Sequence, residues 1–339
     1  MKAIRRFTAV LMAVAAVMCS VFAAVAQTDT TTVSIPGSYW YDMAFDVLEM
    51  VNSQRQAQGL SALTMDEDLM EGAMLRAAET SLLFSHTRPD GTRCFTVSNK
   101  AMGENIAAGS STAEGTMNQW MNSQGHRENI LNTRWSSMGV GCFETNGRYY
   151  WVQLFGEQTA AQAAQPQNRT LEQPVNTLLD NLEPYGSLSS GELKTGQTAT
   201  VRFGWRNQGW QGQYALASAS DLTYVSSDTG IILPDGAGNL RAVGPGTATV
   251  TVSLKGYPEK SLTFTLKVEG EASGTLPGDV DRNGRVESAD ALMALQAATG
   301  KVTLDSLQQQ AADVNNQSGV SAGDALLILQ AATGKITLS

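Results

Sequence analysis

An oxygen-rich loop near the C-terminus, "DVDRNGRVESAD", has the residue types and the spacing of a calcium-binding loop. Its candidate ligands are Asp279, Asp281, Asn283, Arg285 through its carbonyl, and Asp290. They fall at positions 1, 3, 5, 7 and 12, and Gly284 provides the sharp turn at position 6. Calcium takes about six to eight oxygen ligands, and this spacing wraps one chain segment around a single ion. The pattern therefore predicts a calcium site.

A second loop, "DVNNQSGVSAGD", follows 34 residues later (313 − 279) and predicts a weaker calcium site. Its candidate ligands are Asp313, Asn315, Gln317, Gly319 and Asp324. Gln317 replaces the usual carboxylate, Ser318 occupies the turn position, and the glycine comes one place late. Fewer charges and a strained turn both weaken calcium binding.

The chain has two histidines, His86 in "FSHTRPDG" and His126 in "SQGHRENIL", and each lies in a polar stretch. An imidazole can act as a general acid or base, or as a metal ligand. A structural role is the alternative, in which Glu104 of "GEN" caps backbone amides and His126 caps the helix that "RENIL" starts. The residue types alone leave both readings open.

Residues 1–26 predict a signal peptide, with Lys2, Arg5 and Arg6 before an apolar run and "AVA" at 24–26 as the cleavage site. Its removal leaves 20 basic and 32 acidic residues, a net charge of −12. That charge argues against nucleic acid or an anionic membrane as the main partner. No other stretch is long and apolar enough to span a membrane, so we expect a secreted protein.

Composition and periodicity divide the rest of the chain into modules. Helices are expected over 44–59, 69–84 and 111–122, and a strand over 149–156. Residues 158–186, rich in Ala, Gln and Pro at their start, are interpreted as a linker. Alternating apolar and polar residues over 187–269 predict a small β-sandwich, followed by a second linker at 270–277.

The last segment contains an internal repeat. "DALMALQAATGKVTL" (290–304) recurs as "DALLILQAATGKITL" (324–338), with twelve of fifteen positions identical. Each copy predicts an amphipathic helix that ends at a glycine, Gly300 or Gly334.

Two of these modules resemble known domain families. The phrase "VSSDTGIILPDGAGNLRAVGPGTATVTVS" in 187–269 resembles a bacterial Ig-like domain of group 2, for which a spacer or adhesive role is the default. The two loop-plus-helix repeats of 278–339 resemble a type I dockerin. That resemblance implies calcium-dependent docking onto a cohesin domain of a cellulosome-like scaffold, in the setting of polysaccharide catabolism. It also implies that Ser288–Ala289 and Ala322–Gly323, at loop positions 10 and 11, help to choose the cohesin.

The ordered motifs "VNSQRQAQGL", "FSHTRPDG", "GENIAAG", "WMNSQGHRENIL", "MGVGC" and "YYWVQLFG" resemble the CAP (SCP-like) superfamily. We place this domain at 40–157. The resemblance implies an α–β–α sandwich whose cleft brings together His86, Glu104 and His126. The chain is thus expected to be multidomain: an α–β–α sandwich, then an all-β sandwich, then a small α-helical calcium-binding module.

Two imidazoles and a carboxylate in one cleft suit an open divalent-metal site, and zinc is the metal they favour. Without metal, Glu104 and a histidine form an acid/base pair. Animal members usually supply a second cleft carboxylate on the helix before the second histidine, and Ser123 takes that place here. This departure leaves open whether the domain is an enzyme.

Cys94 and Cys142 are the cysteines that remain after residues 1–26, and export favours a disulfide between them. It would close a loop of 48 residues (142 − 94) and stabilise the fold by about 4 kcal/mol. Its position in the CAP-like region would hold the "HTRPDG" loop against the "GVGC" strand. Two buried free thiols are the alternative.

Three functions follow as hypotheses. The first is a secreted modular protein that docks through calcium and cohesin, with a His/Glu cleft for a metal or a small ligand. The second is a hydrolase that acts on peptide or cell-wall substrates through that cleft. The third is a non-catalytic adhesion protein. Peptide, lipid and cell-wall ligands all remain candidates for the cleft.

Overall fold

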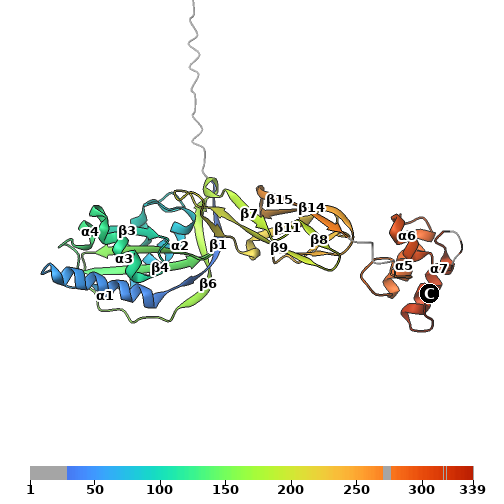
Figure 1. The fold of residues 1–339 in the computed structure, drawn as a ribbon, viewed down its shortest axis with the longest axis horizontal. Coiled ribbons are helices and arrows are strands. Elements are labelled where there is room, and N and C mark those ends of the chain that lie inside the picture. The colour runs from blue at the N-terminus through green and yellow to red at the C-terminus, as the bar shows by residue number, and fades with distance from the viewer. Residues whose placement is uncertain (1–28, 270–275, 316, 318, 339) are drawn as a thin grey trace, which may run out of the picture.

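The computed structural model describes residues 29–269, 276–315, 317 and 319–338, and the chain forms three bodies within these ranges (Figure 1). The N-terminal body comprises residues 30–178, the middle body residues 184–269 and the C-terminal body residues 276–338. The predicted signal peptide lies outside the described residues, as does most of the linker predicted at 270–277. None of the helices in the described ranges combines the length and the apolar character that a membrane span requires.

The N-terminal body is a six-stranded sheet between layers of helices. Its elements are β1 (Thr30–Tyr39), α1 (Tyr41–Ala57), β2 (Thr64–Met65), α2 (Glu67–Leu82), the 3-10 helix η1 (Cys94–Val97), β3 (Gly103–Ala108), α3 (Ala113–Asn122), α4 (Gln124–Ile130), β4 (Ser137–Thr145), β5 (Arg148–Gly156) and β6 (Arg169–Leu178). The strand order is β3-β5-β4-β1-β6, and β2 pairs in parallel with β4. The expected α–β–α sandwich is confirmed, with the three predicted helices as α1, α2 and α3.

Two glycines of the "MGVGC" motif explain how closely α2 packs on the sheet. A Cβ atom on Gly139 would lie 2.1 Å from the backbone of Leu69, and one on Gly141 would lie 2.0 Å from the carbonyl oxygen of Ala73. Only glycine permits this approach of helix backbone to strand backbone. The contact places α2 over β4 and the neighbouring strand β5, from where Arg76 reaches Glu104 on β3.

The prediction of a linker over 158–186 is wrong for its second half. Residues 169–178 form β6, which pairs antiparallel with β1 from Thr30↔Leu178 to Tyr39↔Arg169. Val175 and Thr177 are buried in this edge strand. The proline at 174 is compatible with pairing because an edge strand needs ladder hydrogen bonds on one side only. Sequence reasoning weighed the Gln- and Pro-rich composition and overlooked the alternation of buried and exposed residues.

The middle body is the predicted β-sandwich, consistent with an Ig-like domain. Its strands are β7 (Pro184–Leu188), β8 (Glu192–Lys194), β9 (Thr198–Arg206), β10 (Tyr214–Leu216), β11 (Leu222–Ser226), β12 (Ile232–Pro234), β13 (Asn239–Ala242), β14 (Gly246–Leu254) and β15 (Tyr257–Glu269), with the short helices η2 (Leu179–Asn181) before them and η3 (Ala219–Asp221) among them. One sheet has the order β10-β9-β13-β12 with β7 on β9, and the other has the order β11-β14-β15-β8.

The middle body was expected to be a separate spacer, but it forms hydrogen bonds with the last carbonyls of α2. Asn207 Nδ2 donates to the carbonyls of Thr80 (2.8 Å) and Ser81 (2.7 Å). The amide of Gln208 donates to the Leu82 carbonyl (2.9 Å), and Gln208 in turn accepts from the amide of Phe84 (2.8 Å). The last carbonyls of a helix lack partners within the helix, so the middle body satisfies groups that α2 leaves unpaired.

Aromatic packing reinforces the same contact. Trp210 lies 6.0 Å from the ring of Phe84 and 5.9 Å from the ring of Tyr150, measured between centroids. Buried apolar residues of the N-terminal and middle bodies belong to one continuous cluster, whereas the C-terminal body has its own. The first two bodies therefore share a core.

The C-terminal body confirms the sequence repeat as a pair of packed helices. Its helices are α5 (Ser288–Ala298), α6 (Ser306–Ala312) and α7 (Ala322–Ala332). α5 and α7 pack against each other around Ala294 and Ile328. Gly300 and Gly334 follow them with the same φ of 71°, as expected for helix-ending glycines. The intervening α6 was not predicted.

Candidate functional site

The exposed imidazole of His86 rests against a buried carboxylate on the edge strand β3. His86 Nδ1 lies 2.8 Å from Glu104 Oε1, and the side chain of His86 is 59% exposed whereas that of Glu104 is 1% exposed. Arg76 of α2 donates from Nε to the other oxygen of Glu104 at 2.8 Å. The carboxylate is therefore fixed from behind by an arginine and presents one oxygen to the histidine.

Arg76 belongs to a larger buried ion-pair network that sequence reasoning missed. Its Nη1 donates to Glu79 Oε2 at 2.8 Å, and Arg88 Nη2 donates to Glu79 Oε1 at 2.5 Å. Arg76 Nη2 also donates to the carbonyl of Ser85, the residue before His86, at 2.8 Å. The available signal was the pair "RAAE" in an otherwise apolar helix, since charged residues are rarely buried unless they are paired.

The network keeps Glu104 ionised. Burial alone would raise the pKa of Glu104, but hydrogen bonds from His86 and Arg76 and the charge of Arg76 outweigh it and lower that pKa. The same contacts raise the pKa of Arg76 against the opposing effect of its burial. A carboxylate that stays charged orients the imidazole through Nδ1 and leaves Nε2 free to meet a ligand.

His126 reaches the cleft from α4, on the other side of β3. Asn105 Nδ2 donates to the His126 carbonyl at 3.1 Å, and Asn129 Nδ2 donates to Asn105 Oδ1 at 3.1 Å. These amides attach α4 to the strand that carries Glu104. Burial lowers the pKa of His126, and the nearby charge of His86 lowers it further.

Both structural alternatives for these residues are wrong. α4 begins at Gln124 after the N-cap residue Ser123, so His126 lies within the helix instead of capping its start. The Glu104 carboxylate binds Arg76 and His86 side chains, with no backbone amide among its described partners.

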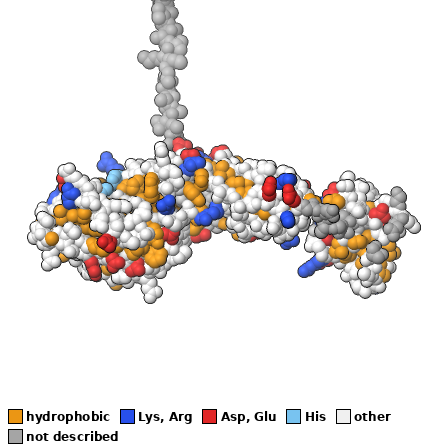
Figure 2. Space-filling model, viewed as in Figure 1, with side chains coloured by type: hydrophobic (Ala, Val, Ile, Leu, Met, Phe, Trp, Pro, Cys, Tyr) orange, Lys and Arg blue, Asp and Glu red, His pale blue; other side chains and the backbone are white. Residues whose placement is uncertain are grey.

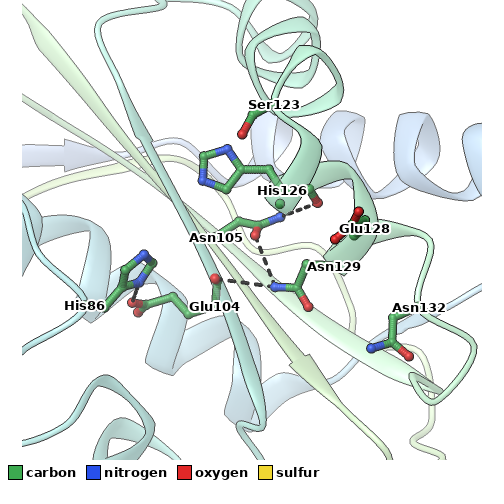
Figure 3. Close-up of a pocket in the computed structure, with 9 residues that line it drawn as sticks. His86, Glu104, Asn105, Ser123, His126, Glu128, Asn129 and Asn132 are labelled. Atoms are coloured by element: carbon green, nitrogen blue, oxygen red, sulfur yellow. Dashed lines mark hydrogen bonds and ion pairs between the residues drawn. The ribbon is translucent and has the colours of Figure 1, made fainter.

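These side chains line one cleft of about 490 Å³ (Figure 3). Its lining residues are His86, Glu104, Asn105, Ser123, Gly125, His126, Glu128, Asn129 and Asn132. A histidine is visible at the surface of the N-terminal body in Figure 2. The structure thus brings His86, Glu104 and His126 to one cavity, whose walls include the amides of Asn105, Asn129 and Asn132 and the carboxylates of Glu104 and Glu128.

The cleft also contains a second carboxylate, which comes from α4. Ser123 lines the cleft, in agreement with the departure noted from the sequence, but Glu128 on α4 lines it as well. Gln124 Nε2 donates to Glu128 Oε1 at 2.8 Å, one helical turn away. The second acid is therefore present, although it comes from a different position of the motif.

In the C-terminal body, the first oxygen-rich loop folds around its own carboxylates. Gly284 adopts a φ of 87°, and its amide donates to Asp279 Oδ2 at 2.8 Å. Asp290 is fully buried and closes the loop, since its two oxygens accept from the amides of Asp281 and Glu287.

The second loop repeats this geometry one residue later. Gly319 has the positive φ, 92°, and its amide donates to Asp313 Oδ2 at 3.2 Å. Asp324 accepts from Asn315 and Ser321 as Asp290 does in the first loop. The late glycine noted in the sequence therefore takes over the role of Gly284.

Comparisons with known proteins match both ends of the chain. The model of the Cysteine-rich secretory protein family (CAP) matches residues 48–155. The model of the Dockerin type I domain matches residues 277–331.

The chain contains a CAP domain and a type I dockerin domain. The uncharacterized protein YkwD of Bacillus subtilis is 38% identical over 142 residues, which is 39% of this chain and 53% of the relative. The chain thus spans about half the length of that CAP relative.

Two solved structures are similar to part of the chain. One is an extracellular protein containing an SCP domain from Bacillus anthracis, 25% identical, covering 34% of this chain and 41% of that one, with a TM-score of 0.32. The other is an outer surface protein from Borrelia burgdorferi, 21% identical, covering 35% of this chain and 94% of that one, with a TM-score of 0.31.

The zinc site expected in the CAP cleft is not supported by the geometry. Among the described residues, three acidic, histidine or cysteine ligand atoms lie within 4.8 Å of one another only at Asp279, Asp281 and Asp290. Glu104 already accepts from Arg76 on both of its oxygens, and one of these oxygens also pairs with His86. A metal would have to displace a buried ion pair, which is costly. The three cleft residues do not fit zinc as arranged.

The dockerin loops, in contrast, fit calcium. In the first, burial and the charges of Asp290 and Asp281 raise the pKa of Asp279, as expected where carboxylates converge without a cation. In the second, Asp313 Oδ1 is buried and has no hydrogen-bond partner among the described residues. The ion would be held by the ligands predicted from the sequence, and it would neutralise these converging oxygens.

The dockerin also exposes matched apolar side chains. Leu292 and Leu326 are each 56% exposed, and Leu295 and Leu329 are 41% and 42% exposed. Each pair occupies the same positions on α5 and α7, offset by 34 residues. The pairs Ser288–Ala289 and Ala322–Gly323, at loop positions 10 and 11, are exposed at the starts of these helices. Figure 2 shows apolar surface on this body.

The predicted disulfide is absent, because Cys94 and Cys142 are buried free thiols. Cys94 lies against Glu104, and its pKa is raised to about 11 by burial and by that carboxylate. Cys142 is opposite Trp151 on β5, three residues from Leu154, which is opposite Glu104. Alternation turns Cys142 and Glu104 to opposite faces of the sheet, and three residues span roughly 10 Å. A disulfide allows about 7 Å between Cα atoms.

Proposed function

We propose that this is a secreted modular protein whose dockerin docks, with calcium, onto a cohesin domain of an extracellular, cellulosome-like scaffold, and whose CAP cleft binds a polar ligand. The repeated loop-and-helix geometry supports the docking half: two calcium-type loops are followed by helices that present matched exposed leucines. An unpaired apolar face beside such loops is typical of a protein interaction surface.

The docking half is tested with the full chain and immobilised cohesin domains in calcium and in excess chelator. We expect binding in calcium only, and loss of binding in a chain that carries both Leu292→Ala and Leu326→Ala. Val225→Ala is the matched control, since Val225 is a 63% exposed apolar residue of the middle body. Binding that survives in chelator would contradict the proposal.

The cleft half rests on one observation: an exposed imidazole is held by a buried, ionised carboxylate at the end of a cavity lined by amides (Figure 3). Polar groups fixed in advance bind ligands with little ordering cost. The test is titration of the full chain with short acetylated peptides, followed through the imidazole resonances of both histidines. Shifts confined to other parts of the chain would refute a ligand site here.

The same pair favours one second function, hydrolysis of peptide or cell-wall substrates. A carboxylate that orients a histidine through Nδ1 is the arrangement of a general acid/base, with Nε2 directed to the substrate. His86→Ala should then abolish turnover, and it is a safe variant because the side chain is largely exposed. Full turnover by this variant would exclude catalysis by the pair.

A further inference from the structure

A second cavity, of about 500 Å³, adjoins the proposed ligand cleft. It shares His86 and Glu104 with the cleft, and its remaining lining residues are Arg93, Cys94 and Phe95. The His86–Glu104 pair stands at one end of the polar cleft in Figure 3, so it separates two cavities of different character. One holds amides and carboxylates, and the other holds an aromatic ring, a thiol and a guanidinium.

Phe95 and Cys94 form an apolar wall in this second cavity. Phe95 is 40% exposed, and its ring has no aromatic neighbour among the described residues. Cys94 is buried, and burial with the adjacent Glu104 raises the pKa of its thiol to about 11, so the thiol stays neutral. A neutral thiol behaves as a small apolar group.

The wall is also fixed to His86 before any ligand arrives. The Cys94 amide donates to the His86 carbonyl at 3.2 Å, and Thr87 pairs with Arg93 in a β-bridge. Arg88, which closes the same loop, donates to Glu79 of the buried network. The aromatic wall and the imidazole are therefore held on one braced loop.

One charge in this cavity is available to a ligand. Arg93 is exposed, and no acidic side chain in the described ranges lies within ion-pair distance of it. A free guanidinium beside an apolar wall matches a carboxylate next to an apolar group.

We propose that this second cavity is an apolar subsite of the CAP cleft, and that the ligand is a peptide with an apolar C-terminal residue. The apolar side chain packs on Phe95, the terminal carboxylate meets Arg93, and the preceding amides run past His86 along Asn105 and Asn129. A plain polysaccharide has no apolar side chain for Phe95, and a lipid has no amide backbone for the polar half. The inference rests on the proposed ligand-binding function and specifies its substrate class.

The test compares acetyl-Gly-Gly-Leu with acetyl-Gly-Gly-Gly, both with free carboxylates, on the full chain by NMR titration. Burial of a leucine side chain strengthens binding by about tenfold to a hundredfold. We expect that preference in the wild type and a fall below threefold in Phe95→Ala. Arg93→Gln should weaken both peptides, whereas amidation of the peptide C-terminus should weaken binding to the wild type only. Met102→Ala is the control, because Met102 is 54% exposed and does not line the cavity.

The outcomes separate the two proposals. If both peptides bind equally and Phe95→Ala changes neither, the subsite is refuted while the cleft remains a ligand site. If the Leu preference persists in Phe95→Ala, the apolar residue binds elsewhere and the subsite is equally refuted. If neither peptide binds the wild type, the peptide class falls, and with it this form of the proposed function.

Discussion

Asn207→Ala should destabilise the N-terminal body, although residue 207 belongs to the middle body. Asn207 is 6% exposed, and its amide donates to the carbonyls of Thr80 and Ser81 at the end of α2. Its Oδ1 accepts from the amide of Trp210 at 3.0 Å. The substitution removes all three hydrogen bonds and leaves two helix-end carbonyls buried without partners.

The expected magnitude follows from these contacts. A typical hydrogen bond contributes about 0.5–1.5 kcal/mol net, and a buried polar group left without a partner costs about 1–3 kcal/mol. Because the lost bonds share one side chain and are not additive, we expect a loss of about 2–4 kcal/mol. A body of this size loses about 2–4 °C in Tm per kcal/mol, so Tm should fall by about 4–16 °C.

The assay is calorimetry of residues 27–339 in calcium, with amide hydrogen exchange as the local readout. Exchange should rise at Phe84, whose amide donates to the Gln208 carbonyl, two residues before His86. Asn176→Ala is the matched control, because Asn176 lies on β6 and its hydrogen bond with Thr32 is exposed.

The control should change stability by less than about 0.5 kcal/mol. If Asn207→Ala costs no more than the control and leaves exchange at Phe84 unchanged, the middle body does not brace the segment that carries His86. It would then act as the spacer first expected.

The remaining predictions concern charges, metal and thiols. Arg76→Met breaks two buried ion pairs at once and leaves Glu79 with Arg88 and Glu104 with His86 as their remaining partners, so it should cost about 3–5 kcal/mol in urea denaturation; a loss below about 1 kcal/mol would contradict the network. Burial lowers the pKa of His126 below its ordinary 6.5, so as pH falls below that value the unfolded chain binds a proton before the folded chain does and stability is lost; Tm should drop between pH 7 and 5, and His126→Gln should flatten that slope. Removal of calcium by a chelator should unfold only residues 276–338, as followed by circular dichroism. A lower Tm for the other two bodies would contradict this prediction. A thiol reagent should detect two free thiols in residues 27–339 after unfolding without reductant. Detection of no free thiol would indicate a Cys94–Cys142 disulfide.

The first oxygen-rich loop shows a geometry that sequence reasoning can predict. All ligands of one loop lie within twelve consecutive residues, from Asp279 to Asp290. The chain needs only a local turn at Gly284 to bring them together, so spacing alone predicts the site. The sequence of the second loop also shows that its glycine comes one place late, and in the structure the turn lies at that glycine, Gly319.

The CAP cleft shows the opposite case. His86, Glu104 and His126 are 18 and 22 residues apart in sequence, and motif resemblance alone suggested that they share a cavity. Whether these three residues fit zinc depends on what else binds Glu104. Arg76 of α2 pairs with Glu104 of β3 and so opposes zinc binding, and this contact between two separate elements could not be predicted from spacing. The prediction of a disulfide was wrong for a similar reason. Whether two cysteines can form a bond depends on their separation and on the face of the sheet that each occupies, and both are set by the tertiary structure.

By itself, the sequence determined the modular order, the helices and strands with regular periodicity, and the two calcium loops. Each of these depends on residues near one another along the chain. Only the tertiary structure decided that residues 169–178 complete the first sheet, that Arg76 and Glu79 hold Glu104, and that Asn207 completes α2. These contacts join residues far apart in sequence, where hydrogen-bond partners are chosen by packing instead of by spacing.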